Sequence, residues 1–209
     1  MRAQGMLRWL ARLPLLALLQ APGAFAGGYS VGVTGGVSSP IGDFKDAFKL
    51  GMSAGGTADY RGGSVFGLGI DFGYHSWKGK NPFWEALAQD LGAAPGTTLT
   101  AKLTAIRYGV HGTVSLPGER RIRPYARLGI DGYNLKQTTD SDDPFFITDF
   151  SKNLTGFNLG IGADCRVAPA TSLGLLSQYH HVGSKDEFGA NATWIELDAV
   201  LTFNIPAEK

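Results

Sequence analysis

Cysteine is nearly absent from this 209-residue sequence, in which Cys165 is the only one. A single cysteine excludes an intramolecular disulfide and any metal site built from several thiolates. Beyond residue 26, no apolar run is long enough for a membrane-spanning helix. An excess of one charge is lacking too, because 19 basic and 18 acidic residues nearly cancel. This balance argues against nucleic acid as a partner.

The first 26 residues have the pattern of a cleaved signal peptide. Arg2, Arg8 and Arg12 form a basic region before an apolar run at 13–19, and Ala24-Phe25-Ala26 has the form of a signal-peptidase site. An uncleaved anchor is the alternative, but the run is about half of the ~20 residues that a spanning helix needs. We therefore expect an exported chain whose residues 27–209 form one domain.

The mature chain alternates apolar and polar residues in eight segments, the pattern of strands with two unlike faces. The clearest alternation is at 66–75, where Phe66, Leu68 and Ile70 are separated by glycines and followed by Asp71 and His75 on the other face. The predicted strands lie at about 29–37, 51–60, 66–75, 99–116, 123–133, 157–167, 172–180 and 194–203.

The connections between these strands alternate in length. Short turns at 61–63, 117–121 and 168–170 separate long links at 38–50, 78–98, 136–152 and 183–190. An even number of strands, with short turns at one rim and long loops at the other, is typical of bacterial outer-membrane barrels. Because the first link is long, we expect the N-terminus at the periplasmic rim and the four long loops outside the cell.

A soluble eight-stranded barrel is the alternative, so the direction of the two faces decides. Bulky apolar side chains from all eight strands would overfill so narrow a lumen, whereas glycines on the polar face leave room there for arginines. Aromatic residues on the apolar face fit an interfacial girdle: Tyr29, Tyr60, Phe66, Tyr74, Tyr108, Tyr179 and Phe203. The sequence therefore predicts an all-β, eight-stranded antiparallel up-and-down transmembrane barrel.

The polar face is expected to line the lumen as one network of opposite charges. Its members are Asp59, Asp71, His75, Arg107, His111, Arg123, Arg127, Asp131, Asp164, Arg166, His180, Glu196 and Asp198. Such a network could conduct small solutes or could plug the lumen with ion pairs. Eight strands leave little free cross-section, and a buried charge without a partner is costly, so we expect a plug.

Four segments carry a family resemblance: 35–44 (GGVSSPIGDF), 69–74 (GIDFGY), 123–130 (RPYARLGI) and 160–164 (GIGAD). They resemble the small OmpA/OmpX-like outer-membrane β-barrel domain proteins, an eight-stranded porin-like family of the Gram-negative envelope. The resemblance implies a fold and a location but no particular function. Barrels of this kind usually end on an aromatic residue that the insertion machinery reads, whereas here Phe203 is followed by residues 204–209.

Catalysis is a weaker hypothesis than structure or binding. His181 and Ser184 could form a nucleophilic pair, as in lipid-modifying outer-membrane enzymes, but a spacing of three places them on different faces of a strand. The spacing of His75, His111 and His180 matches no specific metal site. We expect no enzyme activity, no cofactor and no metal.

The long links carry the strongest candidates for surface interactions, namely Phe83, Trp84, Phe145 and Phe146. These aromatic side chains could bind a surface ligand or could fold over the mouth of the barrel. We expect a structural or surface-interaction role, with outer-membrane lipid, lipopolysaccharide and the barrel-insertion machinery as partners. A transport barrel for small or apolar solutes, like the OmpW-type proteins, is the alternative.

Overall fold

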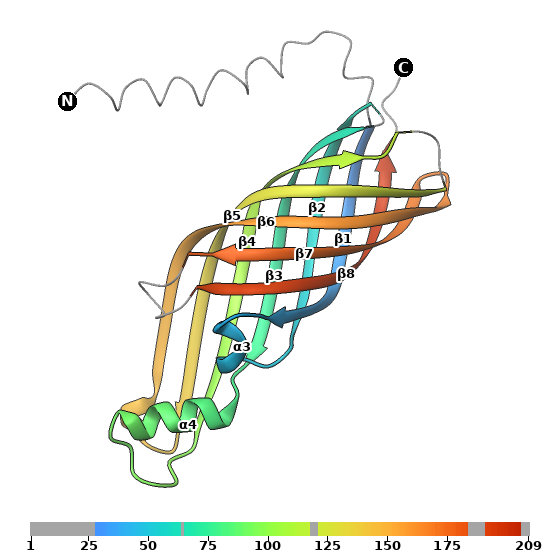
Figure 1. Ribbon diagram of the computed structural model, residues 1–209. Helices are drawn as coiled ribbons and strands as arrows, with labels where there is room; N and C mark the ends of the chain where they lie inside the picture. The colour runs from blue at the N-terminus through green and yellow to red at the C-terminus, as the bar shows by residue number, and fades with distance from the viewer. Residues whose placement is uncertain (1–27, 64, 118–120, 184–190, 206–209) are drawn as a thin grey trace, which may run out of the picture.

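The structure is a computed structural model that describes residues 28–63, 65–117, 121–183 and 191–205, and these form a closed antiparallel barrel with strand order β1 to β8 (Figure 1). The strands are β1 (Gly28–Pro40), β2 (Gly51–Gly62), β3 (Phe66–Lys78), β4 (Leu99–Ser115), β5 (Ile122–Ser141), β6 (Thr148–Ala168), β7 (Thr171–Val182) and β8 (Ala192–Ile205). The predicted all-β, eight-stranded fold is confirmed. The predicted signal peptide lies outside the described residues and stays a prediction.

The outer face of the barrel is an apolar belt. On β3, the outward side chains of Phe66, Leu68 and Ile70 are exposed, whereas Asp71 and His75 on the other face are buried. The outward residues of β8 run from Ile195 to Ile205, which corresponds to about 33 Å along the strand and about 25 Å along the barrel axis at a tilt of ~40°. This height matches the lipid-facing band of outer-membrane barrels, and closure pairs the backbone groups that lipid could not satisfy.

Aromatic side chains border the belt at both ends, as the sequence predicts. At the end with the short turns, Tyr29 and Tyr60 pack with ring centroids 5.2 Å apart. At the other end, Tyr74 and Tyr108 lie exposed on β3 and β4. These girdles mark the two interfaces of the bilayer.

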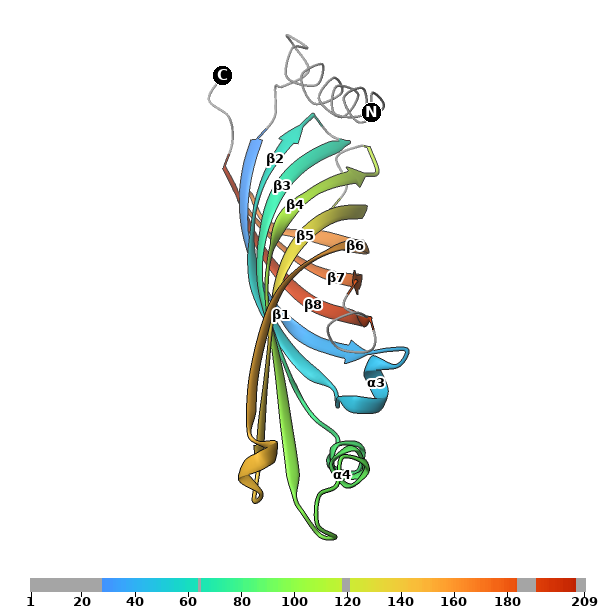
Figure 2. The ribbon, with the colours of Figure 1, turned by 90° about the vertical axis from the view of Figure 1, so that its left-hand side faces the viewer.

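Strands β4, β5 and β6 project well beyond the other strands at the long-loop end (Figures 1 and 2). β5 continues to Ser141 and pairs with β6 as far as Thr139 opposite Thr148. The connection between them is therefore only 142–147, which contains the short 3₁₀ helix η1 (Pro144–Phe146). The prediction of a long link at 136–152 was wrong, because most of that segment is strand.

Within this projection the polarity of the two faces is reversed. On β4, Thr100 and Lys102 point outward, while Leu99, Ala101 and Leu103 point inward and are buried. Nearer the short turns, the outward residues of the same strand are apolar, beginning with Ile106. The outer surface therefore changes from lipid-facing to water-facing between Thr104 and Ile106.

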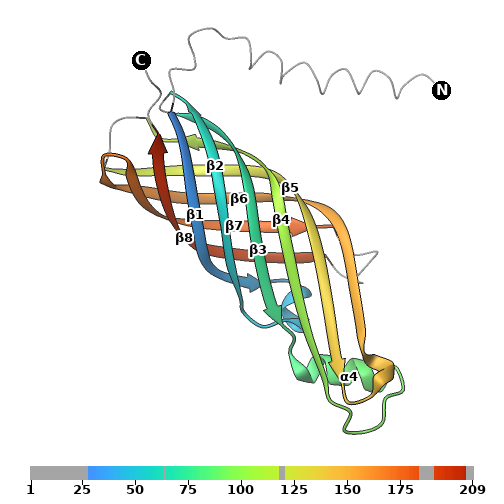
Figure 3. The same cartoon turned by 180° about the vertical axis from the view of Figure 1, so that it is seen from behind.

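Two helices cover the mouth of the barrel at the same end: α3 (Phe44–Ala47) after β1 and α4 (Asn81–Asp90) after β3. Seen from behind in Figure 3, α4 lies across the projecting strands. The two loops are joined by backbone hydrogen bonds of 2.8 Å from the amide of Lys49 to the carbonyl of Lys78 and from the amide of Lys80 to the carbonyl of Ala47. None of the described helices is long and apolar enough to cross a membrane.

Candidate functional site

The interior of the barrel gathers the charged residues and is the candidate site. Near the short turns, the Asp164 carboxylate on β6 contacts two arginines: Arg123 Nη2 on the neighbouring strand β5 at 3.3 Å, and Arg61 Nη2 of β2, across the lumen, at 3.5 Å. A cavity of about 40 Å³ adjoins this group and is bounded also by Tyr125 and Arg127. A space of that size holds about three water molecules. The free space beside the Asp164 group is therefore small.

The middle of the lumen is organised around Asp71 on β3. Its carboxylate accepts a hydrogen bond from Arg127 on β5 and lies 2.7 Å from His111 Nδ1 and 3.9 Å from Arg107 Nη2. The side chain of Asp71 is fully buried. Partners from β4 and β5 thus neutralise a carboxylate that could not remain ionised alone.

His111 connects this group to Asp59. One ring nitrogen lies 2.7 Å from Asp71 Oδ2, and the other lies 2.6 Å from Asp59 Oδ1. Arg127 Nη2 also lies 2.9 Å from His111 Nδ1. The imidazole ring therefore links both carboxylates to the buried arginine.

A second carboxylate group surrounds Asp131 on β5. Asp131 Oδ2 accepts hydrogen bonds from Tyr133 Oη at 2.9 Å and from Asn158 Nδ2 at 2.5 Å, and Arg107 Nη1 lies 3.8 Å away. Gln178 Nε2 on β7 donates to Asn158 Oδ1 at 3.0 Å. Hydrogen bonds between side chains therefore run along the inner wall from β5 through β6 to β7.

Nearer the loops, His180 joins the network to Glu196. His180 Nε2 lies 2.8 Å from Glu196 Oε2, and His180 Nδ1 lies 3.0 Å from Tyr133 Oη. His75 Nδ1 is 3.8 Å from Glu196 Oε1, which is beyond hydrogen-bond distance. Asp198 accepts a hydrogen bond of 2.7 Å from Ser53 Oγ on β2. Side chains from β2, β3, β5, β7 and β8 therefore take part at this level.

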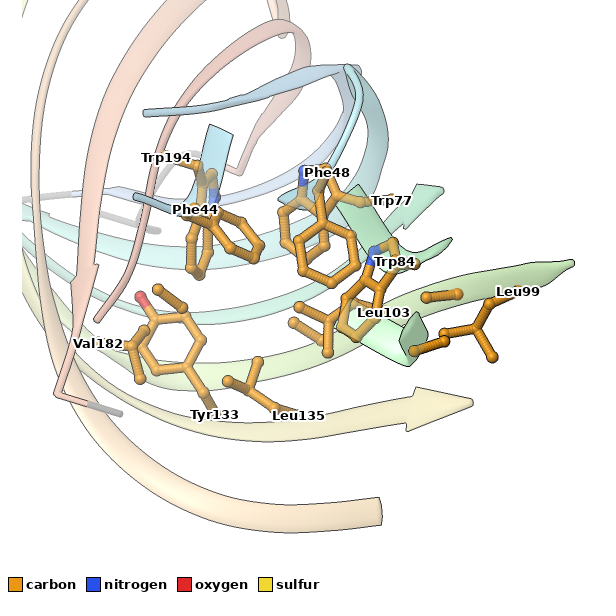
Figure 4. Packing of buried hydrophobic residues seen from close by; sticks show 14 residues of the cluster. Phe44, Phe48, Trp77, Trp84, Leu99, Leu103, Tyr133, Leu135, Val182 and Trp194 are labelled. Atoms are coloured by element: carbon orange, nitrogen blue, oxygen red, sulfur yellow. The ribbon is translucent and has the colours of Figure 1, made fainter. Parts of the chain in front are cut away.

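An aromatic cap closes the lumen above the charged network (Figure 4). Trp194 stacks on His180 with ring centroids 4.9 Å apart, and Trp77 lies 5.1 Å from Trp194. Phe44 of α3 packs against Trp77 at 5.4 Å. The buried cluster that we call the cap comprises Phe44, Phe48, Trp77, Trp84, Ala88, Leu99, Ala101, Leu103, Ala105, Tyr133, Leu135, Val182, Ala192 and Trp194.

The structure places every predicted network residue inside the lumen except one. Arg166 is exposed at the end of β6, beside the register shift between Arg166 and Ala168, and forms no ion pair with the described residues. No group of three or more His, Cys, Asp or Glu side chains in the described chain is arranged to hold a metal ion. His181 lies on the outer face 3.2 Å from Thr193 Oγ1, and Ser184 lies outside the described residues.

The four aromatic loop candidates do not form one surface. Trp84 is buried in the cap and donates a hydrogen bond of 3.0 Å to the carbonyl of Ala47. Phe146 packs partly buried against the cap. Only Phe83 and Phe145 are exposed, at 41% and 79%. The expectation of surface contacts therefore fits these two residues, while Trp84 helps to close the mouth.

Glycines create the space for the charged side chains. A Cβ on Gly109 would collide with Asp131 Oδ1, and one on Gly69 would meet the His111 ring and Asp59 Oδ1. Both glycines share a face with the residues of the network. The predicted role of the polar-face glycines is therefore seen directly at these two positions.

The aromatic cap was missed by reasoning from the sequence, although a signal for it exists. Trp77 has the same parity as Asp71 and His75, and Leu99, Leu103 and Ala105 have the same parity as Arg107. Parity alone assigns these apolar residues to the inside of the barrel. Because the interior was expected to be polar over its whole length, these inward apolar residues were not assigned to a hydrophobic core.

Comparison with known proteins agrees with this architecture. The chain is similar to neisserial surface protein A (NspA), with 18% identity and a TM-score of 0.53 over 84% of this chain and 96% of that one. It is similar to Ail of Yersinia pestis in complex with the heparin analogue sucrose octasulfate, with 12% identity and a TM-score of 0.53 over 85% and 97% of the two chains. The N-terminal barrel of OprF from Pseudomonas aeruginosa matches with 11% identity and a TM-score of 0.50 over 86% and 99%.

Such low identities show a common fold only. Among curated proteins, none matches the sequence significantly. The sequence pattern of the outer membrane protein beta-barrel domain matches residues 10–203, which is most of the chain. The chain therefore belongs to the outer membrane protein beta-barrel domain family, and its apolar belt is the surface that contacts membrane lipid.

Proposed function

We propose that this protein is a closed barrel of the outer membrane that acts through its long-loop end rather than as a channel. One observation carries the proposal: side chains occupy the lumen from the short turns to the mouth. The Asp164 group, the Asp71 and Asp131 groups and the aromatic cap follow one another along the axis. A solute would have to displace ion pairs in the middle and tryptophans at the mouth.

The proposed orientation has the short turns in the periplasm and α4 outside the cell. It is supported by the reversed polarity of the projecting strands, which suits an aqueous environment beyond the membrane. At this end, α4 and the residue that follows it present Phe83, Leu87 and Leu91 as exposed apolar side chains, and η1 presents Phe145. Exposed apolar residues of this kind mark surfaces that contact other molecules. The function is accordingly structural or adhesive, without catalysis.

Planar-bilayer recording tests whether the barrel is closed. Purified, refolded protein is expected to give no stable conducting state at either polarity of the applied voltage, even at high salt. The variant Arg127→Ala removes the main partner of Asp71 but leaves the cap in place, so it is expected to stay closed as well. A reproducible conductance of the native protein that Arg127→Ala alters would favour the transport alternative.

Labelling of whole cells tests the orientation. In a Cys165→Ser background, Leu91→Cys places a thiol directly after α4 and Ala170→Cys places one in the turn after β6; both positions are exposed. A membrane-impermeant maleimide is expected to label the first variant on intact cells and the second only after the outer membrane is permeabilised. The opposite pattern would refute the orientation without affecting the closed lumen.

A further inference from the structure

Five lysines gather around the base of the α3 and α4 loops: Lys45, Lys49, Lys78, Lys80 and Lys102. Two hydrogen bonds bring the loops together: the backbone amide of Lys49 donates to the carbonyl of Lys78, and the side-chain Nζ of Lys80 donates to the carbonyl of Lys45. Lys45, Lys49, Lys78 and Lys102 are exposed. We call this group the lysine cluster.

The centre of the cluster is electrostatically unfavourable as it stands. Lys78 on β3 and Lys102 on β4 are directly opposed in the ladder, and both point outward. Like charges at directly opposed positions destabilise a sheet. In the described part of the chain, neither ammonium group forms an ion pair, whereas Lys136 on the neighbouring strand lies 3.5 Å from Asp149. The Lys78–Lys102 pair therefore lacks the acidic partner that Lys136 has.

The height of this pair above the lipid belt is informative. The last apolar outward pair on the same two strands is Tyr74 opposite Ile106, and Ser76 opposite Thr104 lies between it and the lysines. Four residues correspond to about 13 Å along a strand and about 10 Å along the axis at a tilt of ~40°. The ammonium groups, on flexible four-carbon side chains, thus lie where the membrane's charged headgroups begin.

We propose that the lysine cluster binds the phosphate groups of a phosphorylated glycolipid of the outer leaflet. A phosphate between Lys78 and Lys102 would turn a repulsive cross-strand pair into two charge-assisted contacts. The acyl chains of the same molecule would lie against Tyr74, Ile106 and Tyr108 directly below. Basic side chains at a membrane surface attract anionic lipid in this way. A free inorganic anion would contact the lysines but has no acyl chain to lie against the apolar residues below them.

This inference rests on the proposed orientation, because that orientation puts the cluster in the outer leaflet. A binding experiment in detergent does not depend on orientation and keeps the two questions separate. Native mass spectrometry of the refolded barrel is to be carried out with bis-phosphorylated lipid A, with dephosphorylated lipid A, and with inorganic phosphate as a competitor. We expect binding of the first lipid only, and no displacement by millimolar phosphate.

The double variant Lys78→Gln/Lys102→Gln tests the residues. Each lysine near a charged membrane surface contributes about 1 kcal/mol, which is about five-fold in affinity, so the pair is expected to lose about 25-fold. The matched control is Lys136→Gln, at the same end of the barrel but already paired with Asp149. The affinity of the Lys136→Gln variant for bis-phosphorylated lipid A is expected to change by less than about two-fold.

A charge reversal shows that any loss of binding does not come from misfolding. Lys78→Glu places a carboxylate opposite Lys102, so it is expected to raise the unfolding temperature of the lipid-free barrel slightly while abolishing the binding of lipid A. Equal binding of the dephosphorylated lipid, displacement by inorganic phosphate, or unchanged affinity in the double variant would each overturn the proposal. If lipid A binds as expected but whole-cell labelling gives the opposite pattern, the chemistry of the site stands and the orientation fails.

Discussion

The ion pair between Arg127 and Asp71 offers the sharpest test of how the charged network stabilises the barrel. Both side chains are buried, at 5% and 0% exposed. Replacing Arg127 with methionine keeps a long unbranched side chain but removes the charge. Breaking a buried pair usually costs about 3–5 kcal/mol of unfolding free energy, because the remaining charge stays buried. Asp71 keeps His111 at 2.7 Å and Arg107 at 3.9 Å, so we expect the lower end of that range, about 3 kcal/mol.

The partner variant completes a double-mutant cycle. Asp71→Asn removes the negative charge and keeps a hydrogen-bonding group near His111, and we expect it to cost about 3 kcal/mol as well. With both changes, no charge is left unpaired at this contact. The double variant is therefore expected to cost about 3 kcal/mol rather than the sum of about 6, a coupling of about 3 kcal/mol.

Reversible urea unfolding in lipid vesicles, followed by tryptophan fluorescence, measures these values. The control is Arg166→Met, since Arg166 is exposed at the end of β6, and its cost is expected to stay below about 0.5 kcal/mol. Additive costs in the double variant would show that the two side chains are not coupled. A cost below about 1 kcal/mol for Arg127→Met would show that His111, Arg107 or water, rather than Arg127, compensates the charge of Asp71.

Two further substitutions, each with a matched control, test the cap and the network separately. Trp194→Ala is expected to cost about 3–5 kcal/mol in the same unfolding assay, because Trp194 is fully buried against Trp77 and His180, whereas Phe145→Ala at an exposed position should cost below about 0.5 kcal/mol. Gly109→Val would drive a side chain into Asp131, so we expect no heat-modifiable folded band on a gel, while Gly112→Ala, which meets only Leu68 at 3.9 Å, should fold normally. Normal folding of Gly109→Val would mean that the Asp131 group is looser than the structure has it.

The two faces of each strand could be predicted from the sequence because side chains alternate with a period of two. Parity assigned Asp71, Arg127 and Asp164 to the lumen without any knowledge of which strands face one another across it. The actual partners could not be predicted in this way. Arg127 reaches Asp71 from β5 to β3, and Arg61 reaches Asp164 from β2 to β6. Such contacts depend on strand tilt and on the stagger between strands, which alternation within one strand does not encode.

The misassigned segment at 136–152 has a different cause. The strand criterion was an apolar face turned to lipid, and Lys136 and Thr138 on the outward face of β5 do not satisfy it. The apolar residues at this height are inside, as Leu135 shows. A strand that leaves the membrane keeps its period of two but exchanges the environments of its faces. The alternation therefore continues while the lipid-facing pattern stops.

The barrel consequently contains two kinds of interior: a charged one where the outer face is apolar, and an apolar one where the outer face is polar. Where lipid surrounds the wall, burial of apolar side chains inside gains little over exposing them outside, and paired charges fill the lumen instead. Where water surrounds the wall, the cap forms an ordinary hydrophobic core around Trp77, Trp194 and Leu103. The two obstructions rest on different forces and, apart from Tyr133, on different residues. They meet where His180 stacks on Trp194 and His75 stacks on Trp77, and where Tyr133 contacts His180. Loss of one therefore leaves the other in place, and an open pore requires that both fail together.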